Sequence, residues 1–197
     1  SKSPLSFHPI ALIFGLLSFV SYLVEGAVGD WSALYLFEDK GIVIEEAVMG
    51  VMLFNGTMCI GRLLGNRLGK HLTSKQVVVG GYLLGSIAMG LIVFLPGHAS
   101  MYTYLLLGIS LAMIVPNLFS AMGEQNVIPM TQAVATSTML GYMGILMGPA
   151  LIGFIAHGTS LTVAFIVLTT LLVVSAGIGK YAYHLMSKDC GLSEEQI

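Results

Sequence analysis

Two acidic residues, Glu25 and Asp30, lie in a stretch that is otherwise apolar enough to cross a membrane. Between Pro9 and Val28 the sole charged residue is Glu25, and a helix of this length spans roughly the 30 Å hydrocarbon core of a bilayer. An ionised side chain near the middle of such a helix costs at least about 2.5 kcal/mol, so it usually faces a water-filled cavity or a partner. A carboxyl group in that position can take up and release a proton, which is the chemistry of proton-coupled transport. We therefore predict that Glu25 and Asp30 are proton-coupling residues.

The polar residues around Glu25 share one side of the predicted helix. Residues three and four positions apart lie on the same face, because an α-helix turns once every 3.6 residues. This spacing relates Ser18, Ser21, Tyr22, Glu25, Gly29 and Ser32. Asp30 lies about 140° around the helix from Glu25, so the two acids serve different purposes. Trp31 fits two roles, an anchor at the membrane surface or a stacking surface for a ring-shaped substrate.

The composition excludes an ordinary soluble domain. Of the 197 residues 56% are hydrophobic and 9% are charged, and the mean hydropathy is +0.89. Between Lys75 and Lys180 the sole charged residue is Glu124, and the surface of a soluble fold carries many more charged residues than this. The chain is therefore predicted to be integral to a lipid bilayer, and we expect no nucleic-acid partner.

Polar and helix-breaking residues divide the chain into six apolar spans. With no water in the membrane core each span must satisfy its own backbone, so the fold class is all-α. The spans cover residues 8–37, 46–64, 76–95, 100–122, 130–156 and 160–186. A polar lead-in, residues 1–7, and a polar tail, residues 187–197, flank this transmembrane domain at 8–186.

The remaining polar residues inside the spans give candidates for substrate contacts. Asn55, Asn117 and Tyr142 lie in the second, fourth and fifth spans, and we predict that they bind substrate together with Tyr22 and Trp31. Such a residue, taken alone, also serves often as a hydrogen-bond partner between helices. Because polar residues gather in the first, second, fourth and fifth spans, we expect these to line a cavity and the third and sixth to face lipid.

The basic residues predict the orientation of the spans. Lys and Arg accumulate on the cytoplasmic side of a membrane. Of the eight basic residues, Lys40 alone falls on one side, and the other side holds Lys2, Arg62, Arg67, Lys70, Lys75, Lys180 and Lys188. Both termini are therefore predicted to be cytoplasmic.

Glycine and proline occur inside the spans in a pattern that favours close helix packing. Gly141, Gly144 and Gly148 line one strip of the fifth span, and such strips let membrane helices approach closely. Pro116 and Pro149 also lie inside spans, where proline kinks a helix or frees a carbonyl group.

An enzymatic function is not indicated. Cys59 and Cys190 form no disulfide or metal pattern, and the five histidines fall at span ends or in connections. Neither a nucleophile motif nor a phosphate-binding loop is present in the sequence. We predict that the protein is not an enzyme and uses no cofactor and no metal.

The loop from Gly61 to His71, GRLLGNRLGKH, resembles the D-R-x-G-R-R loop between the second and third helices of each half of the major facilitator superfamily. Asn66 stands where that family often has Asp, so this position lacks the charge that an ion-pair lock would use. The resemblance identifies Arg62, Asn66, Arg67 and Lys70 as a candidate gating loop. The stretches EGAVGDWSALYL, VPNLFSAMGEQ and GYMGILMGPALIGFIAHG are similar to the seventh, tenth and eleventh helices of bacterial inner-membrane members related to sugar permeases and putative exporters.

The resemblance implies one half of a transporter, the C-terminal half, built from two inverted three-helix repeats. Such a protein moves a small polar solute, such as a sugar or metabolite, by alternating access, and Glu25 would carry the coupling proton. Its partners would be the small-molecule substrate and the N-terminal six-helix half, or a second copy of this chain. Two other functions stay open: a half-size carrier that acts as a homodimer, and a membrane scaffold or sensor that transports nothing.

Overall fold

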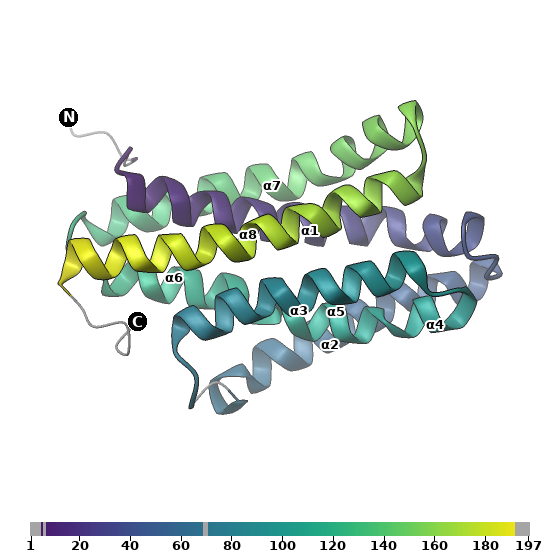
Figure 1. Ribbon diagram of the computed structural model, residues 1–197, viewed down its shortest axis with the longest axis horizontal. Helices are drawn as coiled ribbons and strands as arrows, with labels where there is room; N and C mark the ends of the chain where they lie inside the picture. The colour runs from purple at the N-terminus through teal and green to yellow at the C-terminus, as the bar shows by residue number, and fades with distance from the viewer. Residues whose placement is uncertain (1–4, 6, 69–70, 192–197) are drawn as a thin grey trace.

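A computed structural model of the protein describes Leu5, residues 7–68 and residues 71–191, with the side chains of residues 66 and 68 excepted. Over these residues the chain forms six helical spans that run side by side (Figure 1). The elements are α1 (Pro9–Glu38), α2 (Ile44–Leu68), α3 (Ser74–Phe94), α4 (Gly97–Tyr102), α5 (Tyr104–Ala112), α6 (Ile114–Glu124), α7 (Met130–Gly158) and α8 (Leu161–Cys190). Segments α4 to α6 together make the fourth span. The prediction of an all-helical protein with six membrane spans is confirmed.

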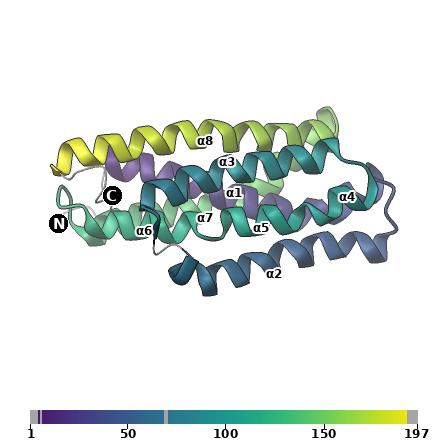
Figure 2. The ribbon, with the colours of Figure 1, turned by 60° about the horizontal axis from the view of Figure 1, so that its bottom comes forward.

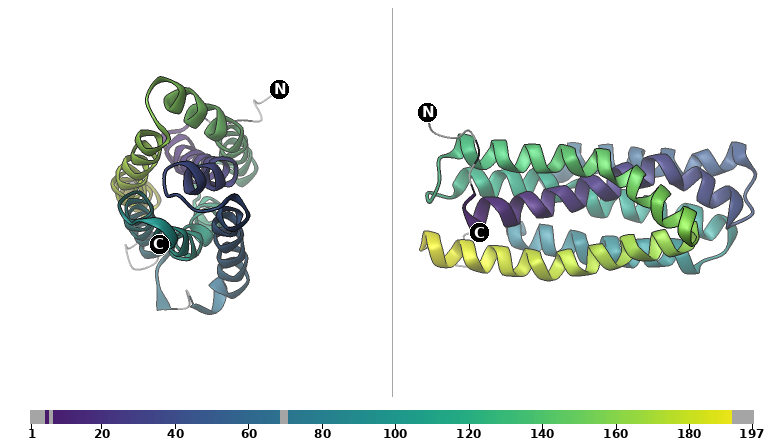
Figure 3. Two further views of the ribbon diagram at one scale, coloured as in Figure 1. Left: turned by 90° about the vertical axis from the view of Figure 1, so that its right-hand side faces the viewer. Right: turned by 90° about the horizontal axis from the view of Figure 1, so that it is seen from above.

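The helices alternate in direction and so define two ends of the bundle (Figure 1). Helix α1 begins and α8 finishes at one end, which we call the terminal end; the α2–α3 and α6–α7 connections lie there too. The other three connections lie at the opposite end. Figures 2 and 3 show α8 and α2 at opposite edges of the bundle, with α3 and α5 between them.

Residues at the helix ends explain where several helices begin and stop. Thr73 and Gln76 form a reciprocal capping box at the start of α3, in which each side chain accepts a backbone N–H of the other residue. The Ser160 side chain caps α8 by accepting the Val163 N–H. At its other end α8 is closed by Gly191, whose φ of 65° is a conformation that glycine adopts without strain.

The fourth span is broken where the sequence predicts a proline effect. Pro116 has no N–H to donate to the Ala112 carbonyl four residues earlier, and α5 ends at Ala112. Met113 between α5 and α6 has φ −101° and ψ −2°, about 40° away from ideal α-helix values in both angles. A second break follows Tyr102, where the Thr103 hydroxyl donates to the Ala99 carbonyl at 2.9 Å. Pro149, in contrast, lies inside α7, which continues past it.

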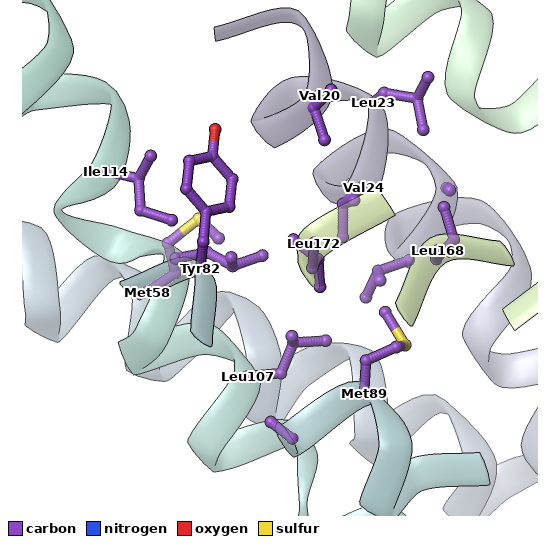
Figure 4. Packing of buried hydrophobic residues seen from close by; sticks show 14 of the residues in the cluster. Val20, Leu23, Val24, Met58, Tyr82, Met89, Leu107, Ile114, Leu168 and Leu172 are labelled. Atoms are coloured by element: carbon purple, nitrogen blue, oxygen red, sulfur yellow. The ribbon is translucent and has the colours of Figure 1, made fainter. Parts of the chain in front are cut away.

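Apolar side chains from all six spans meet in one buried cluster, part of which is drawn in Figure 4. Val24 of α1, Met89 of α3 and Leu172 of α8 converge there, and all three are fully or almost fully buried. Tyr82 of α3 enters the same region and donates its hydroxyl to the Leu17 carbonyl of α1 at 2.6 Å. This bond joins α3 to α1 across the core and holds α1 at the centre of the bundle.

Helices α1 and α7 approach so closely that their backbones touch. A Cβ atom at Gly144 or Gly148 would overlap the carbonyl oxygen of Phe19 or Leu23. From the other side, a Cβ at Gly26 would lie 2.6 Å from the Ile145 carbonyl oxygen. The predicted glycine strip on the fifth span is therefore a helix-packing surface, and it fixes the residues of α1 relative to α7.

Candidate functional site

Glu25 lies within α1 and forms an ion pair with Arg62 of α2. The Arg62 Nη2 atom donates to the Glu25 Oε2 atom at 3.1 Å. The Glu25 side chain is 20% exposed and the Arg62 side chain is 40% exposed, so the pair is partly open on one side. A charge inside a membrane is expected to face a cavity or a partner, and Glu25 has both an exposed side and a cationic partner.

The prediction that Arg62 belongs to a connecting loop is wrong. Helix α2 continues to Leu68, so Arg62 lies more than one turn inside it. Along this part of the helix, Gly61 and Gly65 pack directly against the side chains of Ala112 and Met113. Arg67 lies in the last turn of α2, where a cation favourably meets the negative end of the helix dipole. Asn66 is part of the same helix, but its side chain lies outside the described residues, as does all of Lys70.

Two tyrosines lie beside the ion pair. Tyr22, one helical turn before Glu25, stacks on Tyr142 of α7 with ring centroids 6.3 Å apart and an angle of 6° between the planes. The Tyr22 ring packs where a side chain on Gly141 would be. Tyr142 is 65% exposed, so one face of the stacked pair is open. The structure thus brings four of the predicted site residues together from three helices, namely Tyr22, Glu25, Arg62 and Tyr142.

Trp31 is held against α7 by a defined hydrogen bond. Its indole Nε1–H donates to the Pro149 carbonyl at 2.9 Å, and the ring covers Gly153. Since the N–H is already used, Trp31 can offer a ligand only its ring surface. This bond joins residues 118 positions apart, so no local spacing could have revealed it.

Asp30 lies next to Trp31, on the wall of a cavity of about 640 Å³ between α1 and α7. A second cavity of about 580 Å³ lies on another side of the Trp31 ring, where Glu38, Asp39 and His157 contribute to the lining. Asp30 is exposed, and it lies nearer the opposite end of the bundle than Glu25 does. The two predicted acids therefore have different surroundings.

The two predicted asparagines lie apart from this group. Asn55 is exposed on α2 and donates to the Val51 carbonyl of its own helix at 3.0 Å. Asn117 of α6 donates to the Met113 carbonyl at 2.8 Å and lines a groove between α2 and α3. Both side chains thus use one N–H within their own helix, as short polar residues often do in apolar surroundings.

Sequence reasoning missed two contacts at the opposite end. Lys40 donates its ammonium group to the Val93 carbonyl at the end of α3, at 2.6 Å, and lies 5.3 Å from the centroid of the Tyr35 ring. Burial lowers the pKa of Lys40 from its usual value, and the Asp39 carboxylate acts in the opposite direction. His98 and Glu46 form an exposed pair at 2.7 Å between α4 and α2. The sequence did contain a signal for Lys40, because it is the one basic residue of eight that the predicted orientation puts on the side away from the others.

The sequence of this chain is similar to parts of longer bacterial proteins. No family model matches the chain. An uncharacterised MFS-type transporter of Yersinia pestis is 41% identical over 168 residues, which cover 84% of this chain and 43% of that protein. The membrane protein MosC of Rhizobium meliloti is 30% identical over 170 residues, covering 85% of this chain and 42% of MosC. The chain thus spans less than half the length of the curated relatives that it matches.

The fold is also found in a solved structure. A crystal structure of a variant of the peptide transporter POT, in complex with alafosfalin, superposes with a TM-score of 0.77 at 13% identity. The match covers 93% of this chain and 39% of the other. At this identity the likeness concerns the fold alone, and the chain has the architecture of part of that transporter.

Proposed function

Because this chain belongs to the MFS-type transporters, we propose that it forms the C-terminal six-helix half of a secondary active transporter. The transporter moves a small polar solute, such as a sugar or metabolite, across a bacterial inner membrane by alternating access. The observation that carries the proposal is the ion pair of Glu25 and Arg62, at 3.1 Å between two membrane-spanning helices.

The ion pair supplies a physical mechanism for coupling. An ionised Glu25 attracts Arg62 and so holds α1 to α2. Protonation of Glu25 removes its charge, and the attraction that favours this arrangement of the two helices is lost. Each proton that crosses a potential of 100 mV supplies about 2.3 kcal/mol, which is enough for about a fiftyfold gradient of a neutral solute.

The residues around the pair provide contacts for a solute. Tyr22 and Tyr142 present an aromatic surface beside Glu25, with hydroxyl groups that can bind polar groups of a substrate. Trp31 and Asp30 line a cavity farther along α1, where Trp31 offers its ring and Asp30 a second titratable group. Asn55 lies on the exposed side of α2 and completes the proposed path.

The partner of this half is a second six-helix unit. Helices α2 and α7 bury only 28% and 22% of their apolar windows within this chain, less than any other span described. The relatives are more than twice as long as the matched region, which supports a longer protein over a homodimer of this chain. We place both termini in the cytoplasm, since seven of the eight basic residues are predicted on that side. There Arg67 and Lys70 would form ion pairs that close the path, while Asn66 carries no charge and would add only a hydrogen bond.

A transport assay that separates accumulation from exchange tests the role of Glu25. Membrane vesicles that contain the protein are energised and given a panel of radiolabelled neutral sugars and small metabolites. We expect Glu25→Gln to abolish accumulation against a gradient but to keep exchange of solute at equal concentrations, because exchange moves no net proton. The matched control is Glu46→Gln, which changes an exposed acid of α2 and keeps both activities.

Two results would contradict the proposal. Accumulation by Glu25→Gln at the wild-type level would exclude Glu25 as the proton carrier. A panel in which the wild-type protein transports nothing would exclude a small polar solute of these classes.

A further inference from the structure

A groove of about 520 Å³ runs between α2 and α3 toward the terminal end. Its floor is one face of the broken fourth span, where Met113, Pro116, Asn117 and Ser120 follow helical spacing. Gly61 and Gly65 of α2 form one wall. The other wall is the face of α3 that holds Gln76, Val77, Gly80, Gly81 and Leu84.

The groove stays open because glycines line both walls. A Cβ at Gly61 would lie 2.6 Å from the Ala112 Cβ, and one at Gly81 would lie 2.8 Å from the Ser110 carbonyl oxygen, so these two positions fix the walls to the floor. A Cβ at Gly80 would meet nothing within 4 Å. The space in front of Gly80 is therefore free of protein, although it lies within a membrane span.

The groove is separate from the site around Glu25. Gly61 and Arg62 are neighbours in sequence, but they point about 100° apart on a helix. Gly61 contacts α5, whereas Arg62 contacts Glu25 of α1. What occupies the groove therefore does not depend on the ion pair of Glu25 and Arg62.

The shape and polarity of the groove match one half of a lipid molecule. From Gln76 to Leu84 the α3 wall is about 12 Å long at 1.5 Å per residue, close to half of a hydrocarbon core of about 30 Å. Gln76 and Ser120 lie toward the terminal end of the groove, whereas Leu84 and Ile109 lie deeper in the membrane. An amphiphile with its polar group at the terminal end fits this order.

The charges at the mouth favour an anionic headgroup. Arg67 lies in the last turn of α2, at the terminal end of the bundle, and its side chain is exposed. His71 is also exposed beyond the same end of the groove. A cation near the membrane surface gains about 1 kcal/mol from anionic lipid. We propose that the groove binds one acyl chain of an anionic phospholipid, whose phosphate contacts Arg67.

Lipid retained by the purified protein tests this inference. The chain is extracted in mild detergent with equal amounts of phosphatidylglycerol and phosphatidylcholine, and bound lipid is counted by native mass spectrometry. We expect the wild-type protein to retain phosphatidylglycerol at least fivefold over phosphatidylcholine. Gly80→Phe fills the open space and should abolish this retention. The control Gly177→Phe adds the same ring on α8, where a Cβ also meets nothing within 4 Å, and should leave it unchanged.

A second variant tests the headgroup contact without changing the groove. Arg67→Gln should reduce the preference for phosphatidylglycerol to about that for phosphatidylcholine, while some lipid of either kind is still retained. Equal retention by Gly80→Phe and the wild-type protein, with helical circular dichroism preserved, would overturn the inference. An unchanged preference in Arg67→Gln would overturn the assignment of the phosphate to Arg67, and a bound non-lipid molecule or a second chain displaced by Gly80→Phe would overturn the lipid occupant.

Discussion

The α1–α7 contact and the α2–α3 groove use glycine in opposite ways. At the α1–α7 contact, Gly144 and Gly148 bring two backbones together and no space is left between them. In the groove, Gly80 faces a space that the protein does not fill. Glycine therefore marks a packed contact at Gly144 and Gly148 and an open space at Gly80. The difference depends on whether another helix lies opposite the glycine, which the spacing alone does not encode.

The largest effect that separates these regions is expected from one added methyl group. Gly148→Ala places a Cβ against the Leu23 carbonyl oxygen, and neither backbone can move without shifting the whole α1–α7 contact. Overpacking of this kind costs about 1 to 3 kcal/mol or more. Gly80→Ala meets no atom and removes a helix-destabilising glycine, so it should be neutral or stabilising by up to about 1 kcal/mol.

Thermal unfolding of the two variants in detergent, followed by size-exclusion chromatography of the folded fraction, measures this difference. Opposite signs of the change in stability are expected for the same substitution. Similar losses in both variants would mean that the groove is closed in the protein, and the contrast between the two regions would fail.

Much of the fold could be predicted from the sequence, because each span is fixed by local properties. Apolar runs, the Pro96–Gly97 break and the charged connections define six spans, and Pro116 marks the break in the fourth. Glu25 was found from its charge alone. Its pairing with Arg62 was not, because the resemblance placed Arg62 in the candidate gating loop and no spacing related it to Glu25.

The missing information concerns contacts between residues far apart in the chain. Glu25 of α1 and Arg62 of α2 are 37 positions apart, and the Trp31 bond to Pro149 joins α1 to α7. Asn117 was grouped with Glu25 because both are polar residues in predicted cavity-lining spans, but its side chain lies in the α2–α3 groove. The polarity of Glu25 and Asn117 predicted that both face the protein interior. The arrangement of the helices was needed to show that they face different cavities.

An intermediate effect is expected at the ion pair, which ties the packed region to one wall of the groove. Glu25 belongs to α1 and Arg62 to α2, so the pair is a direct link between the two regions. Arg62→Met leaves Glu25 without this cation and should cost about 1 to 3 kcal/mol, between the values for exposed and buried pairs. Glu25→Gln combined with Arg62→Met should recover most of that loss.

A double-mutant cycle of thermal stability in detergent measures the coupling between the two residues. The matched control is the exposed pair of Glu46 and His98, for which a coupling of about 1 kcal/mol or less is expected. A coupling no larger at Glu25 and Arg62 than in this control would mean that the pair does not hold α1 to α2.

The smallest effect is expected at Lys40, which ties the end of α1 to the other wall of the groove, α3. Burial lowers the pKa of Lys40 in the folded protein, while in the unfolded chain the ammonium group keeps its ordinary value of 10.5. In the alkaline range below 10.5 the unfolded chain therefore binds more protons at this residue than the folded protein does. Stability consequently rises with pH over that range, because deprotonation relieves the penalty on the buried charge. At lower pH both states are protonated, so the penalty stays constant and the slope is absent.

Thermal midpoints measured at several values from about pH 8 to pH 10 test this sign, because the slope depends on the difference in bound protons. Lys40→Met removes the titrating group and should remove this part of the slope, with a small loss of stability at all pH values from the missing bond to the Val93 carbonyl. Lys188→Met, at the exposed end of α8, should leave the slope as it is in the wild-type protein. A slope that persists unchanged in Lys40→Met would show that Lys40 is solvated, and that α3 is held to α1 by the Tyr82 bond in the core and not by a second contact at the opposite end.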